Sequence, residues 1–512
     1  MEQHIRQLLG DALPAADLNA DFLFTELDSL GIATILYVLS QEYDILLDAE
    51  DVTPRNFKNL ASITEMVRRK LSLEMKIRRH AQTCPDKTAV ICGARTMSYA
   101  ALWEAIERRA DSLAAEGLAA GRPYVFRASQ DEDFLVTYCA VHLLGAVAVP
   151  LEHSVPDDAF CRIREEVEAA PLAADTADVL YTTGTTGKSK GVMLSRSALL
   201  AWTDNFISDL HFSPDLLFIV SGPLNHIASL SKIQPTLAVG ATLCILDGLK
   251  DINAFFKVFD LPYKKFATFM VPASLRLMMQ FSYERLHALA EKIDFIETGA
   301  APITQTDMRR LAEALPCSRL YNTYGGTEIG CVCTYDFNDG KYMEGCVGHP
   351  MKNASVEVTR DGQVIVSGST IMSGYVADEE GTRQVLRDGK IYGADLGYVD
   401  EEGMLHLTGR SGDVINVGGF KVNPVEVENA AASWPGLKDC ICIPAVHPVI
   451  GTVLKLLVVL EEGTPLDKHA LAAHIKSRLE SHKVPVYYGQ VDSIKRTYNG
   501  KLDRKAYLTQ PK

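Results

Sequence analysis

The 512-residue sequence contains no Cys-x-x-Cys pair, although it has 11 cysteines. Pairs with that spacing mark most zinc ribbons and dithiol redox sites, so the sequence offers no sign of either. Cys331/Cys333 and Cys440/Cys442 are Cys-x-Cys pairs instead, and no cluster of histidines accompanies them. Side chains two apart on a strand face one side, a spacing that fits packing as well as metal binding. We expect reduced, mostly buried thiols.

The sequence also lacks an excess of positive charge and a long apolar run. Its net charge of −14 argues against a nucleic-acid-binding surface. The most apolar stretch, residues 135–151, contains Tyr138 and His142 and is too short for a membrane span. It predicts a buried helix that runs into a strand ending at Pro150. Since the first residues, Met-Glu-Gln-His, do not form a signal peptide, we expect a cytoplasmic protein without nucleic-acid partners.

The negative charge is concentrated at the beginning of the chain. Residues 1–67 contain twelve acidic and three basic residues, a net charge of −9. Their apolar spacing predicts a small helical bundle over residues 1–72, whose last helix covers residues 57–67. A helix opens at residues 27–31, and five of its apolar residues are predicted to share the buried side: Leu30, Ile32, Ile35, Leu36 and Leu39.

Residues 181–191 form a loop sequence suited to a nucleotide's phosphates: Tyr-Thr-Thr-Gly-Thr-Thr-Gly-Lys-Ser-Lys-Gly. Glycines let backbone N–H groups approach an anion, hydroxyls add donors, and lysines supply positive charge. A Walker A loop needs a glycine five residues before the Gly-Lys-Ser, but Thr182 stands there. The plain alternative is a flexible turn between two strands.

This loop resembles the phosphate-binding signature of the acyl-adenylating superfamily. The superfamily includes acyl-CoA synthetases, aryl-CoA ligases and the adenylation domains of nonribosomal peptide synthetases. Its members activate a carboxylate with ATP as an acyl-adenylate and then pass the acyl group to a thiol. The resemblance extends from about residue 76 to the C-terminus. The phosphate contacts that it implies are Thr182, Thr183, Gly184, Thr185, Thr186, Gly187 and Lys188.

Two later segments follow the same family pattern. Residues 298–302 resemble the loop that packs along the adenine, with implied contacts from Gly299, Ala300 and Ala301. Residues 321–328 resemble the next signature, in which Tyr324 stacks on the purine, Thr327 holds a phosphate and Glu328 binds Mg²⁺. A carboxylate suits the hard Mg²⁺ ion, which bridges phosphate oxygens. The plain alternative is a turn with a solvated Glu328.

The segment of residues 223–229 resembles the lining of the acyl pocket. There, His226 matches a histidine that lies beside the substrate carboxylate. An isolated histidine is more often a core residue, but the flanking pattern favours the pocket. Domains that activate amino acids place an aspartate near this position, and residues 223–235 contain none. The predicted substrate is therefore a carboxylic acid other than an α-amino acid.

Further matches concern the ribose, the hinge and the C-terminal lid. Asp395 matches the ribose-binding aspartate, although Gly-Ala precedes it where Thr-Gly is usual, and Arg410 matches a second ribose contact. Gly412 occupies the hinge position, where Asp or Lys is usual; glycine eases a large φ/ψ change. Residues 499–504 resemble the catalytic-lysine motif, in which Lys501 bridges the substrate carboxylate and the α-phosphate. A solvated basic tail is the plain alternative.

The tripeptide Asp28-Ser29-Leu30 resembles the signature of acyl and peptidyl carrier proteins. In that signature Ser29 bears 4′-phosphopantetheine, and the acidic bundle agrees with the resemblance. It implies a phosphopantetheinyl transferase as a partner, and downstream synthase or reductase domains that dock on the carrier. The alternative is that Asp28 and Ser29 only cap a helix.

These features predict an α/β protein in three parts. We expect a helical-bundle carrier domain over residues 1–74, a large multi-layer α/β adenylating domain over 75–410, and a small mobile α+β lid over 411–512. The predicted enzyme uses ATP and Mg²⁺ to activate an acyl or aryl acid and transfers it to the phosphopantetheine of its own carrier. Two alternatives stay open: an acyl-CoA ligase that uses free CoA while its carrier serves another enzyme, and a non-enzymatic carrier scaffold with a degenerate ligase.

Overall fold

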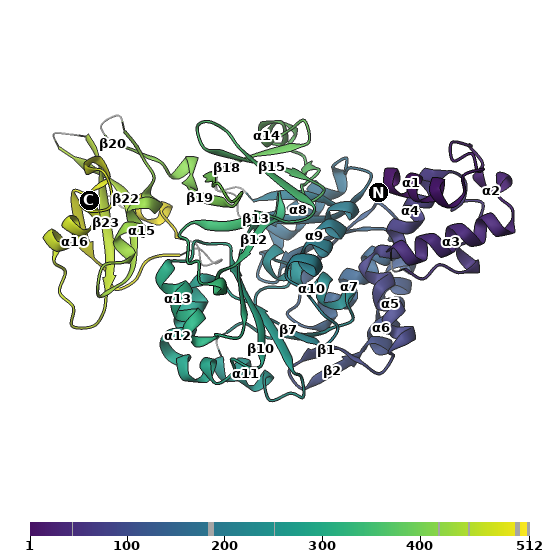
Figure 1. Cartoon of the computed structure of the whole chain (residues 1–512), viewed down its shortest axis with the longest axis horizontal. Coiled ribbons are helices and arrows are strands. Elements are labelled where there is room, and N and C mark those ends of the chain that lie inside the picture. The colour runs from purple at the N-terminus through teal and green to yellow at the C-terminus, as the bar shows by residue number, and fades with distance from the viewer. Residues whose placement is uncertain are drawn as a thin grey trace. The chain divides into compact units, whose positions relative to one another are not determined.

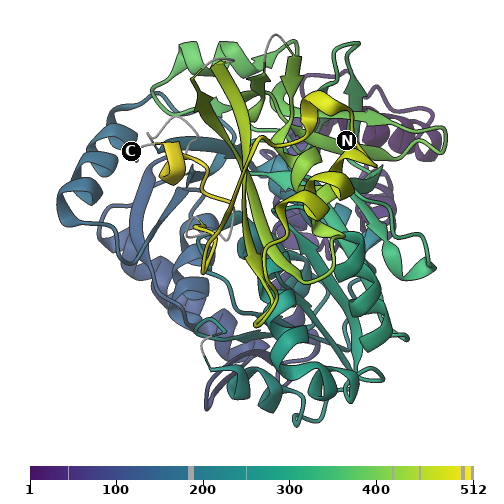
Figure 2. The same cartoon turned by 90° about the vertical axis from the view of Figure 1, so that its left-hand side faces the viewer.

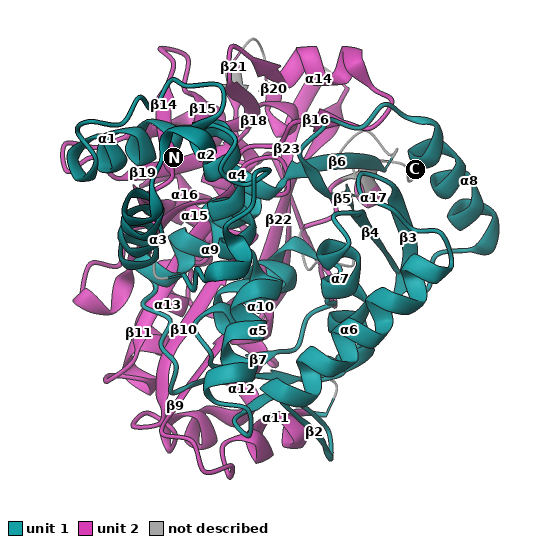
Figure 3. Ribbon diagram, turned by 90° about the vertical axis from the view of Figure 1, so that its right-hand side faces the viewer, with its two compact units in different colours: residues 1–251 teal, residues 252–512 magenta. Residues whose placement is uncertain are grey.

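The structure is a computed structural model that describes residues 1–43, 45–182, 189–249, 251–417, 420–448, 451–496 and 502–508. The chain divides into two compact units, residues 1–251 and residues 252–512, which Figure 3 colours separately. Both units mix helices and strands, so the predicted α/β class is confirmed.

The first unit begins with helices that pack around an apolar cluster of their own, drawn in purple in Figure 1. Their bounds are α1 Glu2–Ala12, α2 Leu23–Glu26, α3 Ser29–Tyr43, η1 Ala49–Asp51 and α4 Leu60–Leu71. Ile5, Leu9, Ile35, Leu39 and Ile63 are fully buried there. Apolar residues at helical spacing therefore produce the helical segment that the sequence predicts at this end of the chain.

The prediction that Leu30 lies on the buried side of α3 is wrong. Ile35 and Leu39 are buried, and Ile32 and Leu36 pack against them, but Leu30 is 74% exposed. At about 100° per residue, Leu30 lies roughly 140° around the helix from Ile35, so both side chains cannot face the same core. Leu30 instead stands next to Ser29 on the exposed surface.

The rest of the first unit alternates helices with mostly parallel strands. Its strands are β1 Thr88–Cys92, β2 Arg95–Ser98, β3 Pro123–Ala128, β4 Val147–Glu152, β5 Thr176–Thr182, β6 Lys190–Ser195, β7 Leu216–Val220 and β8 Thr242–Ile245. Its helices are α5 Leu73–Thr83, α6 Tyr99–Ala115, α7 Glu132–Leu143, α8 Asp157–Ala169, α9 Arg196–Asp209 and α10 Ile227–Ala238. The strand orders are β7-β8-β1-β2 and β6-β5-β4-β3.

The predicted helix and strand in the apolar stretch are α7 and β4, but the predicted strand end at Pro150 is wrong. β4 continues to Glu152, and Pro150 lies opposite Phe126 of β3. In the described ladder, β5 pairs with β4 at Ala148 and not beyond it. Proline removes one N–H from the ladder, but it does not end the strand here.

The second unit contains a mixed sheet in the order β9-β10-β11-β12-β13-β19-β18-β15-β14. The strands of this part are β9 Lys265–Phe269, β10 Ile293–Gly299, β11 Arg319–Gly326, β12 Gly330–Asp336, β13 Cys346–Pro350, β14 Ala354–Val358, β15 Gln363–Gly368, β16 Gly374–Tyr375, β17 Leu386–Arg387, β18 Lys390–Val399 and β19 Leu405–Arg410. Its helices are α11 Ile252–Val258, α12 Pro272–His287, α13 Gln305–Ala314, η2 Phe337–Asp339 and α14 Glu379–Val385. β9, β10 and β11 are parallel, whereas the later pairs are antiparallel.

The C-terminal part of the second unit is a small α+β segment around the long ribbon of β22 and β23 (Figure 2). Its elements are η3 Ser411–Asp413, β20 Ile415–Val417, β21 Phe420–Val422, α15 Pro424–Ala432, β22 Leu437–His447, β23 Gly451–Leu460, α16 Lys468–Lys476, η4 Ser481–Lys483, β24 Tyr487–Gln490 and α17 Lys505–Leu508. Cys440 and Cys442 lie on β22 in the cluster formed with α15 and α16, whereas Ile441 and Ile443 lie in another cluster. This alternation agrees with two thiols that pack on one face of a strand.

Two further observations concern the described residues as a set. They contain no group of three or more His, Cys, Asp or Glu side chains arranged to hold a metal ion. Among the described helices, none is both long enough and apolar enough to cross a bilayer.

Candidate active site

The structure brings the two predicted nucleotide segments of the second unit side by side. β10 and β11 are parallel neighbours, with Gly299 opposite Thr323. A Cβ on Gly299 would lie 2.6 Å from the carbonyl oxygen of Thr323, so only glycine fits at this position. Ala300 follows with a φ of 64°, the left-handed region that side chains rarely adopt. Such backbone outliers collect at binding sites, which agrees with the adenine-loop prediction.

Tyr324 belongs to a hydrogen-bonded cluster in which Asp395 is the common acceptor. Its hydroxyl donates to Asp395 Oδ2 at 2.8 Å, and Arg410 Nε donates to Asp395 Oδ1 at 2.7 Å. Asp395 and Arg410 lie opposite each other on the paired strands β18 and β19. Burial, followed by the charge of Asp395, raises the pKa of the Tyr324 phenol well above its usual value. Three residues predicted to contact purine and ribose therefore meet in one cluster.

Glu328, the predicted Mg²⁺ ligand, has a partner that sequence reasoning did not assign. The hydroxyl of Tyr375 donates to Glu328 Oε1 at 3.2 Å. Burial and the charge of Glu328 raise the pKa of Tyr375, so this phenol stays a donor. The Gly374-Tyr375 pair fits the family pattern, but a contact over 47 residues leaves no local signal in the sequence. Thr327, the predicted phosphate contact beside Glu328, is buried.

Thr182 and His226 are two predicted nucleotide and substrate contacts that the structure describes in the first unit. Thr182 ends β5, and its carbonyl oxygen accepts a 2.8 Å hydrogen bond from the Oγ of Ser189, the residue before β6. β5 and β6 are antiparallel partners on either side of the predicted phosphate loop. His226 stands directly before α10, and its carbonyl accepts from the N–H groups of Ser229 and Leu230. The predicted phosphate contacts from Thr183 to Lys188 lie outside the described residues.

The catalytic lysine predicted at position 501 also lies outside the described residues, but both flanks of its segment are described. Arg496 and Leu502 form an antiparallel bridge. Arg504 Nη2 donates to the buried carboxylate of Glu428 on α15 at 2.8 Å. Residues on both sides of Lys501 are therefore held against the C-terminal sheet and helix.

Gly412, the predicted hinge, lies exposed in the short helix η3. A Cβ built there would meet no atom within 4 Å, and its φ lies outside the left-handed region. The described conformation therefore does not require glycine at this position.

Ser29, the predicted attachment residue, is exposed at the first position of α3. Asp28 is the residue that caps this helix, because its Oδ1 accepts from the N–H of Gly31 at 2.7 Å. The capping function is thus supplied by Asp28. The position of Ser29 leaves its side chain accessible to another protein.

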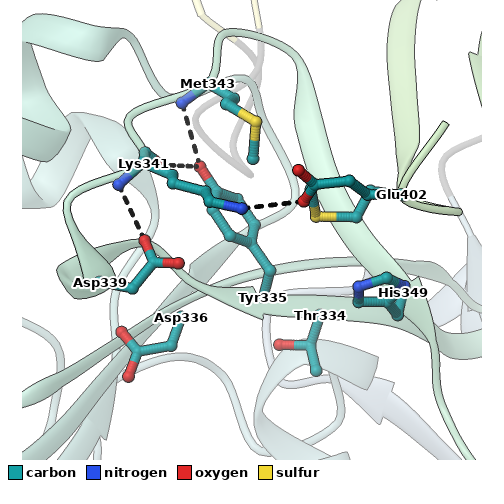
Figure 4. A pocket seen from close by; sticks show the side chains of 9 residues that line it. Thr334, Tyr335, Asp336, Asp339, Lys341, Met343, His349 and Glu402 are labelled. Atoms are coloured by element: carbon teal, nitrogen blue, oxygen red, sulfur yellow. Dashed lines mark hydrogen bonds and ion pairs between the residues drawn. The ribbon is translucent and has the colours of Figure 1, made fainter. Parts of the chain in front are cut away.

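A pocket of about 320 Å³ in the second unit contains none of the predicted site residues (Figure 4). It is lined by Thr334, Tyr335, Asp336, Asp339, Lys341, Met343, His349, Glu402 and Met404. Lys341 Nζ forms a 2.8 Å ion pair with Glu402, and the hydroxyl of Tyr335 donates to the carbonyl of Lys341. The charge of Lys341 is balanced by Glu402 within the same pocket. We therefore keep the candidate active site at the predicted nucleotide residues.

Comparison with protein-family models gives two matches. The model described as "AMP-binding enzyme" matches residues 77–173 and 164–376, and the model described as "AMP-binding enzyme C-terminal domain" matches residues 426–501. Residues 1–76 lie outside both matches.

The chain is also similar to curated CoA ligases and to solved structures. The chain is 28% identical to feruloyl-CoA synthase of Amycolatopsis sp. over 83% of its own length and 96% of the relative's. It is 27% identical to indoleacetate–CoA ligase of Aromatoleum aromaticum over 84% of its own length and 96% of the relative's. Its fold resembles that of ATP-bound MatB from Rhodopseudomonas palustris, with a TM-score of 0.76 at 24% identity over 86% of this chain and 98% of that one.

Proposed function

The chain belongs to the AMP-binding enzyme family, and on that premise we propose that it joins a carboxylic acid to the thiol of coenzyme A at the expense of ATP. Its curated relatives include CoA ligases matched over nearly their whole length, which supports an AMP-forming ligase that makes a carbon–sulfur bond. These relatives support free CoA, rather than the chain's own carrier, as the proposed acceptor.

The Tyr324–Asp395–Arg410 cluster is the observation that carries the proposal. Tyr324 contributes an aromatic face and Asp395 a carboxylate, which suit a purine and a ribose, and the glycine-only contact at Gly299 brings bare backbone beside them. The hydroxyl of Thr298, next to Gly299, is buried without a hydrogen-bond partner among the described residues, an exception of the kind that calls for an explanation by function. These residues fit ATP as a substrate, and Glu328 fits the Mg²⁺ that accompanies it.

The reaction follows in two balanced steps. A carboxylate oxygen of the acid attacks the α-phosphorus of ATP, the acyl-AMP forms, and pyrophosphate leaves. The sulfur of the thiol then attacks the acyl carbonyl, AMP leaves, and the thiol proton goes to solvent or to a nearby base. In the first step Lys501 neutralises the developing charge, and His226 orients the carboxylate at the start of α10.

The acid is proposed to be an acyl or aryl carboxylic acid without an α-amino group. Residues 223–235 lack the aspartate that would hold an α-ammonium. The stretch of residues 269–279 supplies buried Met270, Leu275, Met278 and Met279 for an apolar group. Ferulate, indoleacetate and fatty acids of graded length therefore form a suitable panel.

ATP–pyrophosphate exchange with this panel tests the proposal. We expect exchange with at least one apolar acid, and a loss of ~10²-fold or more in Lys501→Ala, the range for removing one group that stabilises transition-state charge. The same variant should still convert supplied acyl-AMP and CoA to the thioester. If no acid supports exchange in the wild-type protein, the ligase proposal is wrong and the non-enzymatic carrier scaffold becomes the better description.

A second candidate acceptor is a phosphopantetheine arm on Ser29. It is favoured by one observation: Ser29 is exposed at the beginning of α3, with Asp28 as the helix cap and Leu30 exposed beside it. A transferase needs such an accessible hydroxyl. Comparing acyl transfer to CoA with acyl transfer to arm-bearing protein decides between the two acceptors.

A further inference from the structure

A buried charged cluster in the first unit takes no part in the proposed chemistry. His142 on α7 lies with Nε2 2.7 Å from Asp178 Oδ1 on β5 and with Nδ1 3.3 Å from Glu74 Oε1 on α5. All three side chains are at least 95% buried. Only the protonated imidazole carries an N–H on both nitrogens, so the arrangement suits an imidazolium between two carboxylates.

The electrostatics agree with this geometry. Burial alone would lower the pKa of His142, but the charge and hydrogen bond of Asp178 and the charge of Glu74 outweigh it and raise the pKa to about 9. Burial would raise the pKa of Glu74, and His142 reverses this and lowers it. The other titratable groups coupled to the cluster are Tyr138 and Cys139 of α7, whose pKa values burial raises so that both stay neutral.

Hydrogen bonds extend the cluster to two more helices. The hydroxyl of Tyr138 donates to Asp178 Oδ2 at 2.8 Å and accepts from Gln234 Nε2 at 3.1 Å. Thr203 Oγ1 of α9 then donates to Gln234 Oε1 at 2.9 Å. α6, the other helix against α7, presents a buried side that is apolar apart from Tyr99. Five elements, α5, α7, α9, α10 and β5, thus share one buried network.

The network reaches two elements of the candidate active site. Asp178 is fully buried in β5, four residues before Thr182, where the predicted phosphate loop begins. Gln234 lies in α10, the helix that begins directly after His226. α5, which carries Glu74, follows α4 after the single residue Ser72, and Figure 1 labels α5, α7, α9 and α10 close together.

We propose that His142 is a positioning residue for adenylation, because it fixes Asp178 and with it the strand that leads into the predicted phosphate loop. Tyr138, one turn earlier on the same helix, joins Asp178 to Gln234 of the helix behind His226. Buried ion groups contribute little net stability, since desolvation offsets their attraction. Their hydrogen bonds are directional, however, and fix orientation. The proposal rests on the adenylation proposed above, and it goes beyond it by assigning a function to a group that touches no substrate.

The test compares His142→Gln with His80→Gln in ATP–pyrophosphate exchange. His80 lies on α5 and bonds the carbonyl of Ala238 at the end of α10 at 2.9 Å, so its loss also loosens α5 from α10 but leaves β5 untouched. We expect His142→Gln to fold and to raise the KM for ATP about tenfold or more, the size of one lost charged hydrogen bond. His80→Gln should keep the wild-type KM while lowering the melting temperature.

The dependence of the KM for ATP on pH is a second measurement, and a group with a purely structural function would not change it. In wild-type protein the KM for ATP should rise as the pH passes about 9, where His142 loses its proton. Glu74→Gln removes one of the two carboxylates, so this rise should move to lower pH by about one pH unit, while the KM at pH 7 stays near normal. His142→Gln should lack this rise.

Three results overturn the proposal. The first is a folded His142→Gln variant with wild-type KM and kcat across this pH range. The second is an equal increase of the KM in His80→Gln, which would indicate general loosening. The third is failure of both His142→Gln and Glu74→Gln to fold, which would make the cluster a structural support alone. An absence of exchange in wild-type protein is distinguishable from all three, since it refutes the proposed function itself.

Discussion

At the scale of single residues, the candidate active site depends on carboxylates that accept hydrogen bonds from tyrosine hydroxyls and, at Asp395, also from a guanidinium. Asp395 accepts from Tyr324 and Arg410, and Glu328 accepts from Tyr375. A carboxylate has about four lone-pair sites, so each of these groups can still accept from a ligand. The protein side of the site is therefore ordered while it keeps capacity for ribose hydroxyls or a metal ion.

Asp395→Asn should weaken ATP binding. The amide keeps the size of the side chain but loses the charge that holds Arg410, and its NH₂ group can face the Tyr324 hydroxyl or the guanidinium. Hydrogen bonds to charged groups contribute about 1.5–3 kcal/mol, so the KM for ATP in pyrophosphate exchange should rise about tenfold or more. Asp361→Asn, in the turn before β15, is the matched control and should change nothing. An unchanged KM in Asp395→Asn would remove this carboxylate from the ribose site.

At the scale of elements, the C-terminal segment combines a short connection with a firmly packed body. η3 leads from β19 to β20, and Gly412 at its middle has open space around it. After it, α15 and α16 pack on β22 and β23, and Arg504 bonds Glu428. This contrast suits a segment that moves as a body about η3.

Substitution of Gly412 should separate the two half-reactions. Gly412→Ala fits the described conformation, because its Cβ meets no atom within 4 Å, and it should leave adenylation and melting temperature unchanged. Gly412→Pro fixes φ, which should slow thioester formation from supplied acyl-AMP while adenylation continues if the held state is the adenylating one. If both half-reactions run at the wild-type rate in Gly412→Pro, this residue is not the hinge.

Glu428 should make the stability of this segment depend on pH. Burial, only partly opposed by Arg504, raises the pKa of Glu428 from 4.5 to about 7. Between these values the folded chain holds a proton that the unfolded chain has released, so the stabilisation present below pH 4.5 is lost as the pH rises through about 7. Melting curves at pH 5 and pH 8 should show a larger loss in wild-type protein than in Glu428→Gln.

The matched control for this measurement is Glu426→Gln on the same helix. Its carboxylate forms an ion pair with Lys483 at 2.6 Å and is partly exposed. This variant should keep the wild-type difference between pH 5 and pH 8. An equal pH dependence in wild-type protein and Glu428→Gln would contradict the assignment.

At the scale of the whole molecule, a helical segment precedes residue 77, where the match to the AMP-binding enzyme family begins. The family models begin at residue 77, and the apolar cluster around Ile35 belongs to the preceding helices. The acidic residues of this segment and the exposed Ser29 supply the reasons for proposing an acyl carrier. Ser72 alone separates α4 of this segment from α5.

Ser29→Ala tests the carrier without disturbing the ligase. Incubation of wild-type protein with a phosphopantetheinyl transferase and CoA should add one arm, seen in the intact mass, and ATP with the right acid should then add one acyl group. Ser29→Ala should take neither addition and keep full pyrophosphate exchange, whereas Ser40→Ala, on the same helix, should behave as wild type. No arm on the wild-type protein, or acylation of Ser29→Ala, would exclude the carrier. An arm that is acylated much more slowly than free CoA would leave CoA as the acceptor.

The sequence by itself determined the features that depend on near neighbours. The helix that opens near Asp28 and the helix before β4 follow from short apolar patterns, and the ordered glycines, threonines and charged residues identify the family. Helical and strand periodicities are local, so a few residues suffice to indicate them. The prediction was wrong for Leu30, because it assigned five apolar residues of α3 to one buried face although Leu30 points elsewhere.

Only the tertiary structure decided which distant side chains meet. The register of β18 against β19 pairs Asp395 with Arg410, and the packing of α5, α7 and β5 encloses His142 between Glu74 and Asp178. Asp178 and Glu74 are 104 positions apart, and nothing in the residues around either one indicates the other. Such pairs arise because burial removes water as the competing partner, and that condition exists only after the elements have packed.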